Sequence, residues 1–489
     1  MITKSLFDLK KPKDECAVFG VFNNKDAAAL TVLGLHALQH RGQDSTGIVS
    51  FSEKFLKFYG HRGIGQVSEV FANSDIIKKL EGSSCIGHNR YGTTGETALK
   101  NVQPLFSEIL TGGVAIAHNG NLTNTNTLKS DLINSGSIFQ STSDTEVILH
   151  LISTTKGDLI DRLIYALHSI SGAYSLVMLS NDTLIGLRDP LGIRPLVLGK
   201  LNDSYILSSE SCGLDIIGAE LIRDVEPGEI VLINKQGLKS IKPFNKAKLR
   251  PCLFEYIYFS RPDSVLEGKN VYEVRKNIGI ELAKESEKDD IKIDKVVPIP
   301  DSGNASALGF SEYIKKPFEF GIIRNHYTGR TFIEPSNSIR HLGVKLKHNP
   351  NLASIKNQSI ALIDDSIVRG TTSVKIVEML RSSGAKEIHM RIASPPVKHP
   401  CYYGIDTPSK DELLAAKYTV EEIAKIIGVD TLKFITLDGV YRALGFKNGR
   451  NNEDPEYTDH YFSGDYPVKL VDKKIGNKPS QLSLLIETK

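Results

Sequence analysis

The sequence predicts an α+β domain followed by an α/β domain with a parallel sheet. Its 489 residues exceed what one hydrophobic core usually holds, so at least two domains are expected. In the first half, polar clusters each follow or precede a β-type or apolar run, which predicts stacked sheets whose loops converge on one site. In the second half, residues 360–395 have the pattern strand, loop, helix, strand, which is the unit of a parallel sheet.

Composition and charge are those of an ordinary soluble globular protein. Apolar residues make up 40% of the chain and charged residues 24%, and the net charge of +3 gives no reason to expect a nucleic-acid or membrane partner. No apolar run reaches the ~18 residues of a membrane span, and the start lacks the apolar core of a secretory signal. Five widely spaced cysteines without a Cys-x-x-Cys motif indicate a reduced, cytoplasmic location.

The first half begins with a charged leader, residues 1–15. Residues 16–22 then form an apolar run that predicts a strand, and Asp26 caps a predicted helix that reaches about His40. Polar clusters follow at residues 40–45, 87–93, 117–121 and 143–146. Near residues 234–249 the chain turns basic and polar, and we expect the linker between the two domains there.

The second domain opens at about Cys252, and a long amphipathic helix is predicted over Val271–Glu285. A predicted strand, residues 296–300, leads into Asp301-Ser302-Gly303, a strand-to-loop junction of the kind that binds ligands in parallel sheets. Residues 324–336, with Arg340, Lys345 and Lys347, are basic, polar and longer than a usual connection. They suit a lid over an anionic substrate, and a solvated loop is the alternative.

The stretch Ile360–Ser373 carries the strongest chemical signal. A short apolar strand ends in Asp364 and Asp365, and small and hydroxyl residues then precede a helix that Gly384 would end. Free N–H groups at a helix start suit a phosphate, whereas two carboxylates would repel one and fit a ribose diol or Mg²⁺. A strand that merely ends in a polar turn is the plain alternative.

This string resembles the phosphoribosyl pyrophosphate (PRPP) signature of type I phosphoribosyltransferases. The resemblance implies that Asp364 and Asp365 hold the ribose hydroxyls, directly or through Mg²⁺. It also implies that the following loop holds the 5-phosphate, and that Ser302 joins the two aspartates around the metal and pyrophosphate. A helix N-cap is the alternative role of Ser302. The loop residues implied in PRPP binding are Ser366, Arg369, Gly370, Thr371 and Thr372.

The clusters of the first half, from Cys16 to about Gly237, resemble glutamine amidotransferases of the N-terminal-nucleophile class. That resemblance implies a four-layer αββα sandwich with Cys16 as the nucleophile. Asn119 and Gly120 would form the oxyanion hole, Arg90 would bind the glutamine α-carboxylate, and Asp144 would bind its α-ammonium group. An ordinary surface ion pair is the alternative for Arg90 and Asp144.

In that class the catalytic cysteine is the first residue of the mature chain. A free α-amino group titrates near pH ~8, so it can serve as the base for the thiol of its own residue. Cys16 can use this chemistry only after the leader is removed. We therefore expect residues 1–15 to be a propeptide that is cleaved between Glu15 and Cys16.

Glutaminase and phosphoribosyltransferase signatures in this order are typical of the glutamine phosphoribosylpyrophosphate amidotransferases. The resemblance implies a glutaminase domain at 16–240 and a phosphoribosyltransferase domain at 250–489. It also implies the committed step of purine synthesis, in which glutamine, PRPP and water give 5-phosphoribosylamine, glutamate and pyrophosphate. Mg²⁺ as cofactor, purine nucleotides as inhibitors and a homo-oligomer (dimer or tetramer) are further expectations.

The sequence departs from the family pattern at the cysteines that bind an iron–sulfur cluster. Family members with a cleaved leader usually hold a [4Fe–4S] cluster with four cysteines, of which Cys252 and Cys401 occupy two positions. Residues 448–464, where the other two are expected, contain no cysteine, and two thiolates cannot hold the usual cluster. We therefore expect no cluster, with both cysteines as ordinary buried thiols.

Two other functions remain as alternatives. A hexosamine-forming amidotransferase would share the first half, but its sugar-isomerase domains do not explain residues 360–373. A PRPP-sensing regulator would share the second half, but it has no use for Cys16 together with Arg90, Asn119 and Asp144.

Overall fold

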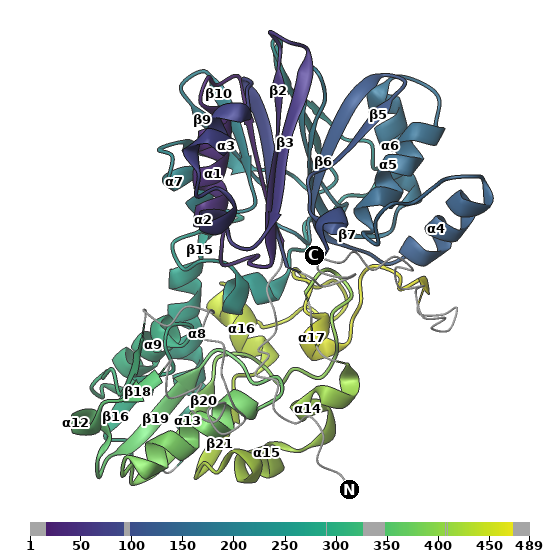
Figure 1. The fold of residues 1–489 in the computed structure, drawn as a ribbon. Helices are drawn as coiled ribbons and strands as arrows, with labels where there is room; N and C mark the ends of the chain where they lie inside the picture. The colour runs from purple at the N-terminus through teal and green to yellow at the C-terminus, as the bar shows by residue number, and fades with distance from the viewer. Residues whose placement is uncertain are drawn as a thin grey trace, which may run out of the picture.

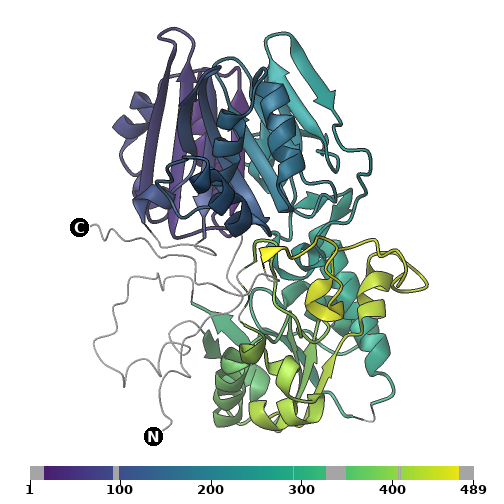
Figure 2. The ribbon, with the colours of Figure 1, turned by 90° about the vertical axis from the view of Figure 1, so that its right-hand side faces the viewer.

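The computed structural model describes residues 16–91, 98–289, 291–325, 348–405, 407 and 409–472. The expected propeptide, residues 1–15, lies outside these ranges, as does nearly all of the expected lid with Arg340, Lys345 and Lys347. In Figure 1 the first half of the chain forms the upper body, and the second half forms the lower body. Figure 2 shows the same two bodies after a quarter turn.

Two antiparallel sheets form the centre of the upper body. The first has the strand order β11 (Glu220–Asp224), β9 (Val197–Leu201), β10 (Ser204–Ser208), β1 (Ala17–Phe22), β4 (Ser84–Arg90), β2 (Ser45–Ser52), β3 (Lys57–Ile64). The second has the order β13 (Gly237–Ile241), β12 (Ile230–Asn234), β8 (Leu184–Arg188), β7 (Gly172–Leu179), β6 (Gly112–Leu122), β5 (Leu105–Ile109). Strand β13 lies inside the stretch expected as linker, so the irregular connection begins only after Ile241.

Alternation along the strands explains how the sheets pack. Val18 of β1 and Ala117 of β6 point into one core between the two sheets. Phe19 of β1 points the other way, into a core shared with helix α1 (Ala27–Ala37), and Ile116 of β6 points into a core shared with α5 (Thr145–Thr154) and α6 (Leu159–Ser169). Strands buried on both faces read as continuous apolar runs, as residues 16–22 do. The result is the predicted four-layer αββα sandwich.

Shorter elements complete the upper body. They are α2 (Val67–Val70), α3 (Ser74–Lys79), η1 (Leu99–Asn101), α4 (Thr125–Asn134) and α7 (Cys212–Asp215). Helix α1 ends at Ala37, one turn before the predicted end, because the next bonds are of the tighter turn type, from the N–H of Gln39 to the carbonyl of His36 and from that of Arg41 to Leu38.

The lower body is built on a parallel sheet, as predicted. Its strand order is β16 (Lys295–Pro298), β19 (Ser359–Asp364), β20 (Glu387–Ile392), β21 (Thr431–Phe434). Helices α8 (Val271–Ser286), α9 (Asn304–Ile314), α13 (Thr371–Ser382) and α15 (Val420–Ile427) connect and cover it. The predicted helix over 271–285 is thus α8, one residue longer, and Asn270 caps its start by accepting the N–H of Glu273.

The remaining elements are short. They are η2 (Glu255–Phe259), β14 (Val265–Leu266), β15 (Lys269–Asn270), β17 (Ile322–Arg324), β18 (His348–Pro350), α12 (Leu352–Ile355), η3 (Lys410–Glu412), α14 (Leu414–Lys417), α16 (Leu437–Ala443) and α17 (His460–Ser463). One core, which includes Ala173 and Ile193 of the upper body, also contains Cys252 and Tyr403 of the lower body. The two bodies therefore share a packed interface.

Candidate functional site

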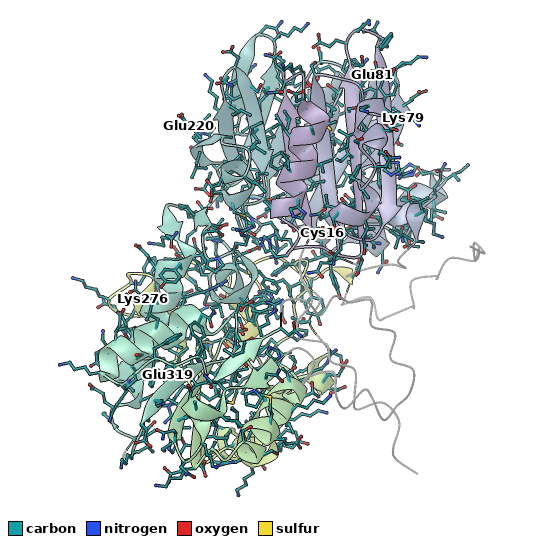
Figure 3. The ribbon with its side chains drawn as sticks, turned by 60° about the vertical axis from the view of Figure 1, so that its left-hand side comes forward. Cys16, Lys79, Glu81, Glu220, Lys276 and Glu319 are labelled. Carbon is teal, nitrogen blue, oxygen red and sulfur yellow. The ribbon has the colours of Figure 1, made fainter. Side chains whose placement is uncertain are left out.

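Cys16 lies at the lower rim of the upper body, on the side that faces the lower body (Figure 3). It directly precedes β1, whose residue Ala17 pairs with Asn89 of β4, and its thiol contacts the carbonyl of Tyr91 at 3.8 Å. Burial raises the pKa of the Cys16 thiol, and the Tyr91 contact and the charge of Arg90 offset that rise only in part. At neutral pH the thiol is therefore protonated and needs a base to become a nucleophile.

Strand β6 brings Asn119 and Gly120 to the same rim. Nε2 of His88 in β4 lies 3.0 Å from the carbonyl oxygen of His118, which ties the two sheets together one residue before Asn119. The Asn119 side chain is fully buried, and neither its oxygen nor its nitrogen has a hydrogen-bond partner among the described residues. Buried amides are nearly always paired, so this one is poised for a group that the described residues do not supply.

Asp144 lies directly before helix α5 and is buried. It accepts the N–H of Leu122 at 3.0 Å, and Nδ1 of His118 lies 3.6 Å from its carboxylate. Burial acts to raise the pKa of Asp144, but His118 and the backbone N–H groups outweigh it and hold that pKa below its usual range. Asp144 is thus a fixed anion. The charges of Asp144 and Arg90 both act on the Cys16 thiol, so the structure gathers these predicted residues in one region.

The predicted PRPP residues lie together at the carboxyl edge of the parallel sheet. Strand β19 ends at Asp364, and Pro298 of β16 pairs with Ile363, so the loop with Ser302 lies beside the two aspartates. Asp364 and Asp365 are almost fully buried, and the Ser366 hydroxyl donates to Asp365 at 2.6 Å. The Ser302 hydroxyl oxygen is buried and has no partner within the described part of the chain. Helix α9 has Gly303 as its N-cap, so the alternative role of Ser302 is wrong.

The loop after β19 leads into helix α13. Gly370 adopts a left-handed conformation (φ +74°), which any other residue would adopt only with strain, and Thr371 and Thr372 start the helix. Arg369 is held by Glu412, with 2.9 Å between Nε and the carboxylate. Loop and helix start thus present partly exposed hydroxyl and N–H groups beside the aspartates, as a phosphate site requires.

Cys252 and Cys401 lie near each other, as the cluster positions would require, but Tyr461 separates them. Its hydroxyl lies 3.5 Å from the sulfur of Cys252 and 3.2 Å from that of Cys401. Cys252 is fully buried and burial raises its pKa to about 11, whereas Cys401 is only partly buried, contrary to our expectation for that residue. Throughout the described ranges, no group of three or more His, Cys, Asp or Glu side chains is arranged to hold a metal ion.

Sequence reasoning missed one set of residues at the interface. The guanidinium of Arg41 binds the backbone of Cys16 and the carboxylates of Glu210 and Glu255, all in the buried region between the two bodies. A local signal did exist, because Glu255 is the one acidic residue inside the apolar run of residues 252–259. A buried acid of this kind requires a partner, although the sequence does not say which one.

Fold and site together define a glutaminase of the N-terminal-nucleophile class joined to a type I phosphoribosyltransferase domain. The glutamine amidotransferase domain profile matches residues 88–215. The glutamine PRPP amidotransferase of Bacillus subtilis, solved with ADP and GMP, superposes with a TM-score of 0.87 at 42% identity and covers 93% of this chain and 98% of its own.

Curated relatives agree with the structural match. The amidophosphoribosyltransferase of Rhizobium etli is 54% identical, and the alignment covers 96% of each chain. The chloroplastic amidophosphoribosyltransferase 1 of Arabidopsis thaliana is 46% identical over 96% of this chain and 81% of the plant protein. The chain belongs to the amidophosphoribosyltransferase family. It is a glutamine-dependent pentosyltransferase of the first step of purine biosynthesis.

Proposed function

We propose that the two parts of the chain divide this reaction, with residues 16–240 releasing ammonia from glutamine and residues 250–489 joining it to PRPP. Residues 1–15 act as a propeptide whose removal exposes Cys16. The observation that carries the proposal is the buried amide of Asn119, which has no partner among the described residues and lies at the rim where Cys16, Arg90 and Asp144 meet. A buried amide without a partner costs stability, so a function for it is the simplest reason for its presence.

In the glutaminase step the α-amino group of Cys16 takes the thiol proton, and the sulfur attacks the side-chain carbonyl of glutamine. The Asn119 amide and the Gly120 N–H stabilise the oxyanion that forms. The C–N bond then breaks, ammonia leaves with the transferred proton, and water hydrolyses the thioester to glutamate. Arg90 and Asp144 bind the α-carboxylate and the α-ammonium group, and the raised pKa of Cys16 explains why a base is required.

In the transferase step Asp364 and Asp365 bind the ribose hydroxyls of PRPP. Ser366, Arg369, Gly370, Thr371 and Thr372 bind the 5-phosphate at the start of α13. The side chains of Asp364, Asp365 and Ser302 offer only oxygen donors, which suits Mg²⁺, an ion commonly held by one or two carboxylates and substrate phosphates. When bound, Mg²⁺ would neutralise charge on the departing pyrophosphate.

The cysteines do not fit an iron–sulfur cluster. The Tyr461 hydroxyl lies between Cys252 and Cys401, and two thiolates are too few for the usual cluster. We therefore keep the prediction that the enzyme works without one, and no step is assigned to it.

The partners and the location that we propose are those expected of the family. Glutamine and PRPP are the proposed substrates, and purine nucleotides are proposed inhibitors, since the related Bacillus enzyme was solved with ADP and GMP. A homo-oligomer in the cytoplasm remains our expectation. No helix in the described ranges has the length and apolar character to span a membrane.

The division of labour is tested by measuring pyrophosphate release from PRPP with glutamine or with ammonia, on protein whose amino-terminus has been determined by mass spectrometry. We expect the active chain to start at Cys16. Cys16→Ala should abolish the glutamine-dependent reaction and leave the ammonia-dependent one. An active chain with an intact leader would contradict the proposed base, and loss of both reactions in Cys16→Ala would contradict the division.

A further inference from the structure

We propose that Glu255, a residue of the second half of the chain, is a positioning residue for Cys16 and acts through Arg41. The inference rests on the proposed function, in which Cys16 is the nucleophile. It adds that the glutaminase site is incomplete without a carboxylate from the other domain.

Arg41 reaches Cys16 through the backbone. Its Nε–H donates to the Cys16 carbonyl at 3.3 Å. Cys16 precedes the first paired residue of β1, and once the leader is removed nothing precedes it in the chain. The carbonyl is then the main-chain group of Cys16 that can fix where its thiol and α-amino group point. A donor held rigidly at that carbonyl therefore controls the geometry of attack, and an error of about 1 Å can cost about 10²-fold in rate.

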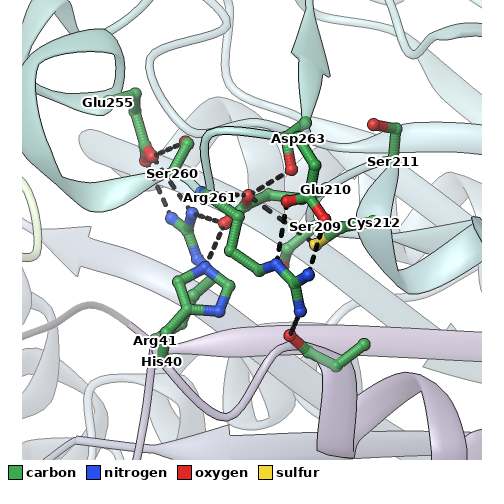
Figure 4. A network of polar contacts seen from close by, with 12 residues as sticks. His40, Arg41, Ser209, Glu210, Ser211, Cys212, Glu255, Ser260, Arg261 and Asp263 are labelled. Atoms are coloured by element: carbon green, nitrogen blue, oxygen red, sulfur yellow. Dashed lines mark hydrogen bonds and ion pairs between the residues drawn. The ribbon is translucent and has the colours of Figure 1, made fainter. Parts of the chain in front are cut away.

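Two carboxylates hold Arg41 in turn (Figure 4). Glu255 accepts from both terminal nitrogens, at 2.8 and 3.0 Å, and Glu210 accepts from one of them at 2.5 Å. All three side chains are almost completely buried. Burial acts to lower the pKa of Arg41, but the charges of Glu255 and Glu210 more than reverse this, so the guanidinium stays charged.

Glu255 comes from η2, at the start of the second half, and is itself held in place. The Ser260 hydroxyl donates to it at 2.6 Å, and Nη1 of Arg194 lies 3.4 Å away. Burial acts to raise the pKa of Glu255, whereas Arg41 and Arg194 lower it, so this carboxylate is ionised. A bidentate arginine–carboxylate pair fixes orientation as well as charge. Without Glu255, Arg41 keeps its contact with Glu210 and loses the fork that sets its direction.

The test compares Glu255→Gln with Glu267→Gln. Glu267 is a matched control because it is also mostly buried and also pairs across the two bodies, but with Arg188 of the upper body, at 2.8 Å. We measure kcat and KM for glutamine, the ammonia-dependent rate, and the rate at which iodoacetamide alkylates Cys16. Glu255→Gln should lower the glutamine-dependent kcat about tenfold or more and slow alkylation, with KM and the ammonia-dependent rate within about twofold. Glu267→Gln should leave the ratio of the two activities unchanged.

A purely structural role predicts a different pattern. If Glu255→Gln lowers both activities together, or changes neither, the inference is overturned. Should Glu255→Gln fail to fold, Ser260→Ala decides the matter, because it removes one hydrogen bond to Glu255 and keeps every charge. It should lower only the glutamine-dependent kcat, by about twofold to fivefold, and an unchanged ratio of activities would overturn the inference. A wild-type enzyme without glutamine-dependent activity would instead refute the proposed function itself.

Discussion

Replacing Asn119 with alanine separates catalysis from stability at the proposed oxyanion hole. The side chain is fully buried on β6, and both polar atoms of its amide lack a partner among the described residues. Such an amide has lost its hydration without gaining a hydrogen bond in return. Asn119→Ala therefore removes a group whose binding energy is used only when an oxyanion forms.

The substitution should lower the rate of glutamine hydrolysis without lowering the stability of the fold. Loss of one oxyanion donor costs about 3 kcal/mol of transition-state stabilisation, or about 10²-fold in the glutamine-dependent kcat. The folded variant no longer contains the unpaired amide, whose desolvation costs about 1–3 kcal/mol, so its stability rises by that amount. It loses about 1 kcal/mol to the cavity of roughly 40 Å³ that the amide leaves, at about 24 cal/mol per Å³. The free energy of unfolding should thus stay level or rise slightly.

Asn121→Ala is the matched control for this experiment. Asn121 lies two residues further along the same strand, but its amide donates to the carbonyl of Tyr402 at 2.9 Å. We expect this control to keep kcat within a few-fold and to lose about 1 kcal/mol of stability. The assay is single-turnover glutamine hydrolysis alongside urea unfolding. A loss of 3 kcal/mol or more in stability for Asn119→Ala, with kcat almost unchanged, would refute the reasoning.

Three further variants test other parts of the structure. Asp144→Asn should raise KM for glutamine. Because the folded pKa of Asp144 is lowered, its stabilising effect is present above about pH 4 and is lost as the pH falls through that lowered value. In urea unfolding from pH 6 to pH 2, the wild type should therefore lose its advantage in free energy of unfolding over the variant. A difference that stays constant with pH would contradict this prediction. Gly404→Ala should lower the melting temperature and glutamine-dependent activity, since its φ is +112° and a Cβ would lie 2.9 Å from the Gly120 backbone; an unchanged melting curve would show that the contact yields easily. Tyr461→Phe should lower the free energy of unfolding by about 1 kcal/mol. Colorimetric assay of the purified wild-type protein should find almost no iron, and near-stoichiometric iron would contradict the prediction that the enzyme has no iron–sulfur cluster.

The parts of the site that the sequence predicted are local strings. Residues 360–373 contain a strand end, two acids and a helix start in a row, and a parallel sheet places such a row at its carboxyl edge wherever the strand lies. Helix α8 was similarly readable, because the apolar spacing of one face and a cap at Asn270 are both local. Such signals can be read from a single sequence because residues that are close along the chain produce them.

The interface could not be read in this way. Arg41 and Glu255 are 214 residues apart, and Asn121 and Tyr402 are 281 apart, so no spacing or periodicity links either pair. The linker was also misplaced in part, since β13 is short and half-exposed and its lysine, Lys239, is typical of a loop. A polar edge strand gives little apolar alternation, and its pairing with β12 is visible only in the folded chain.

The contacts at the end of β6 argue that the two domains are not independent units. The carbonyl of Tyr402 accepts from Asn121, and the Gly404 backbone packs so closely against that of Gly120 that position 404 has no room for a side chain. The Tyr403 carbonyl accepts from Arg194 at 2.9 Å, and Arg194 also lies beside Glu255. A chain cut near residue 240 would keep every proposed glutaminase residue. It would nevertheless lose the surface that supports the oxyanion strand, and it would lose Glu255, whose carboxylate forms the bidentate pair with the buried Arg41.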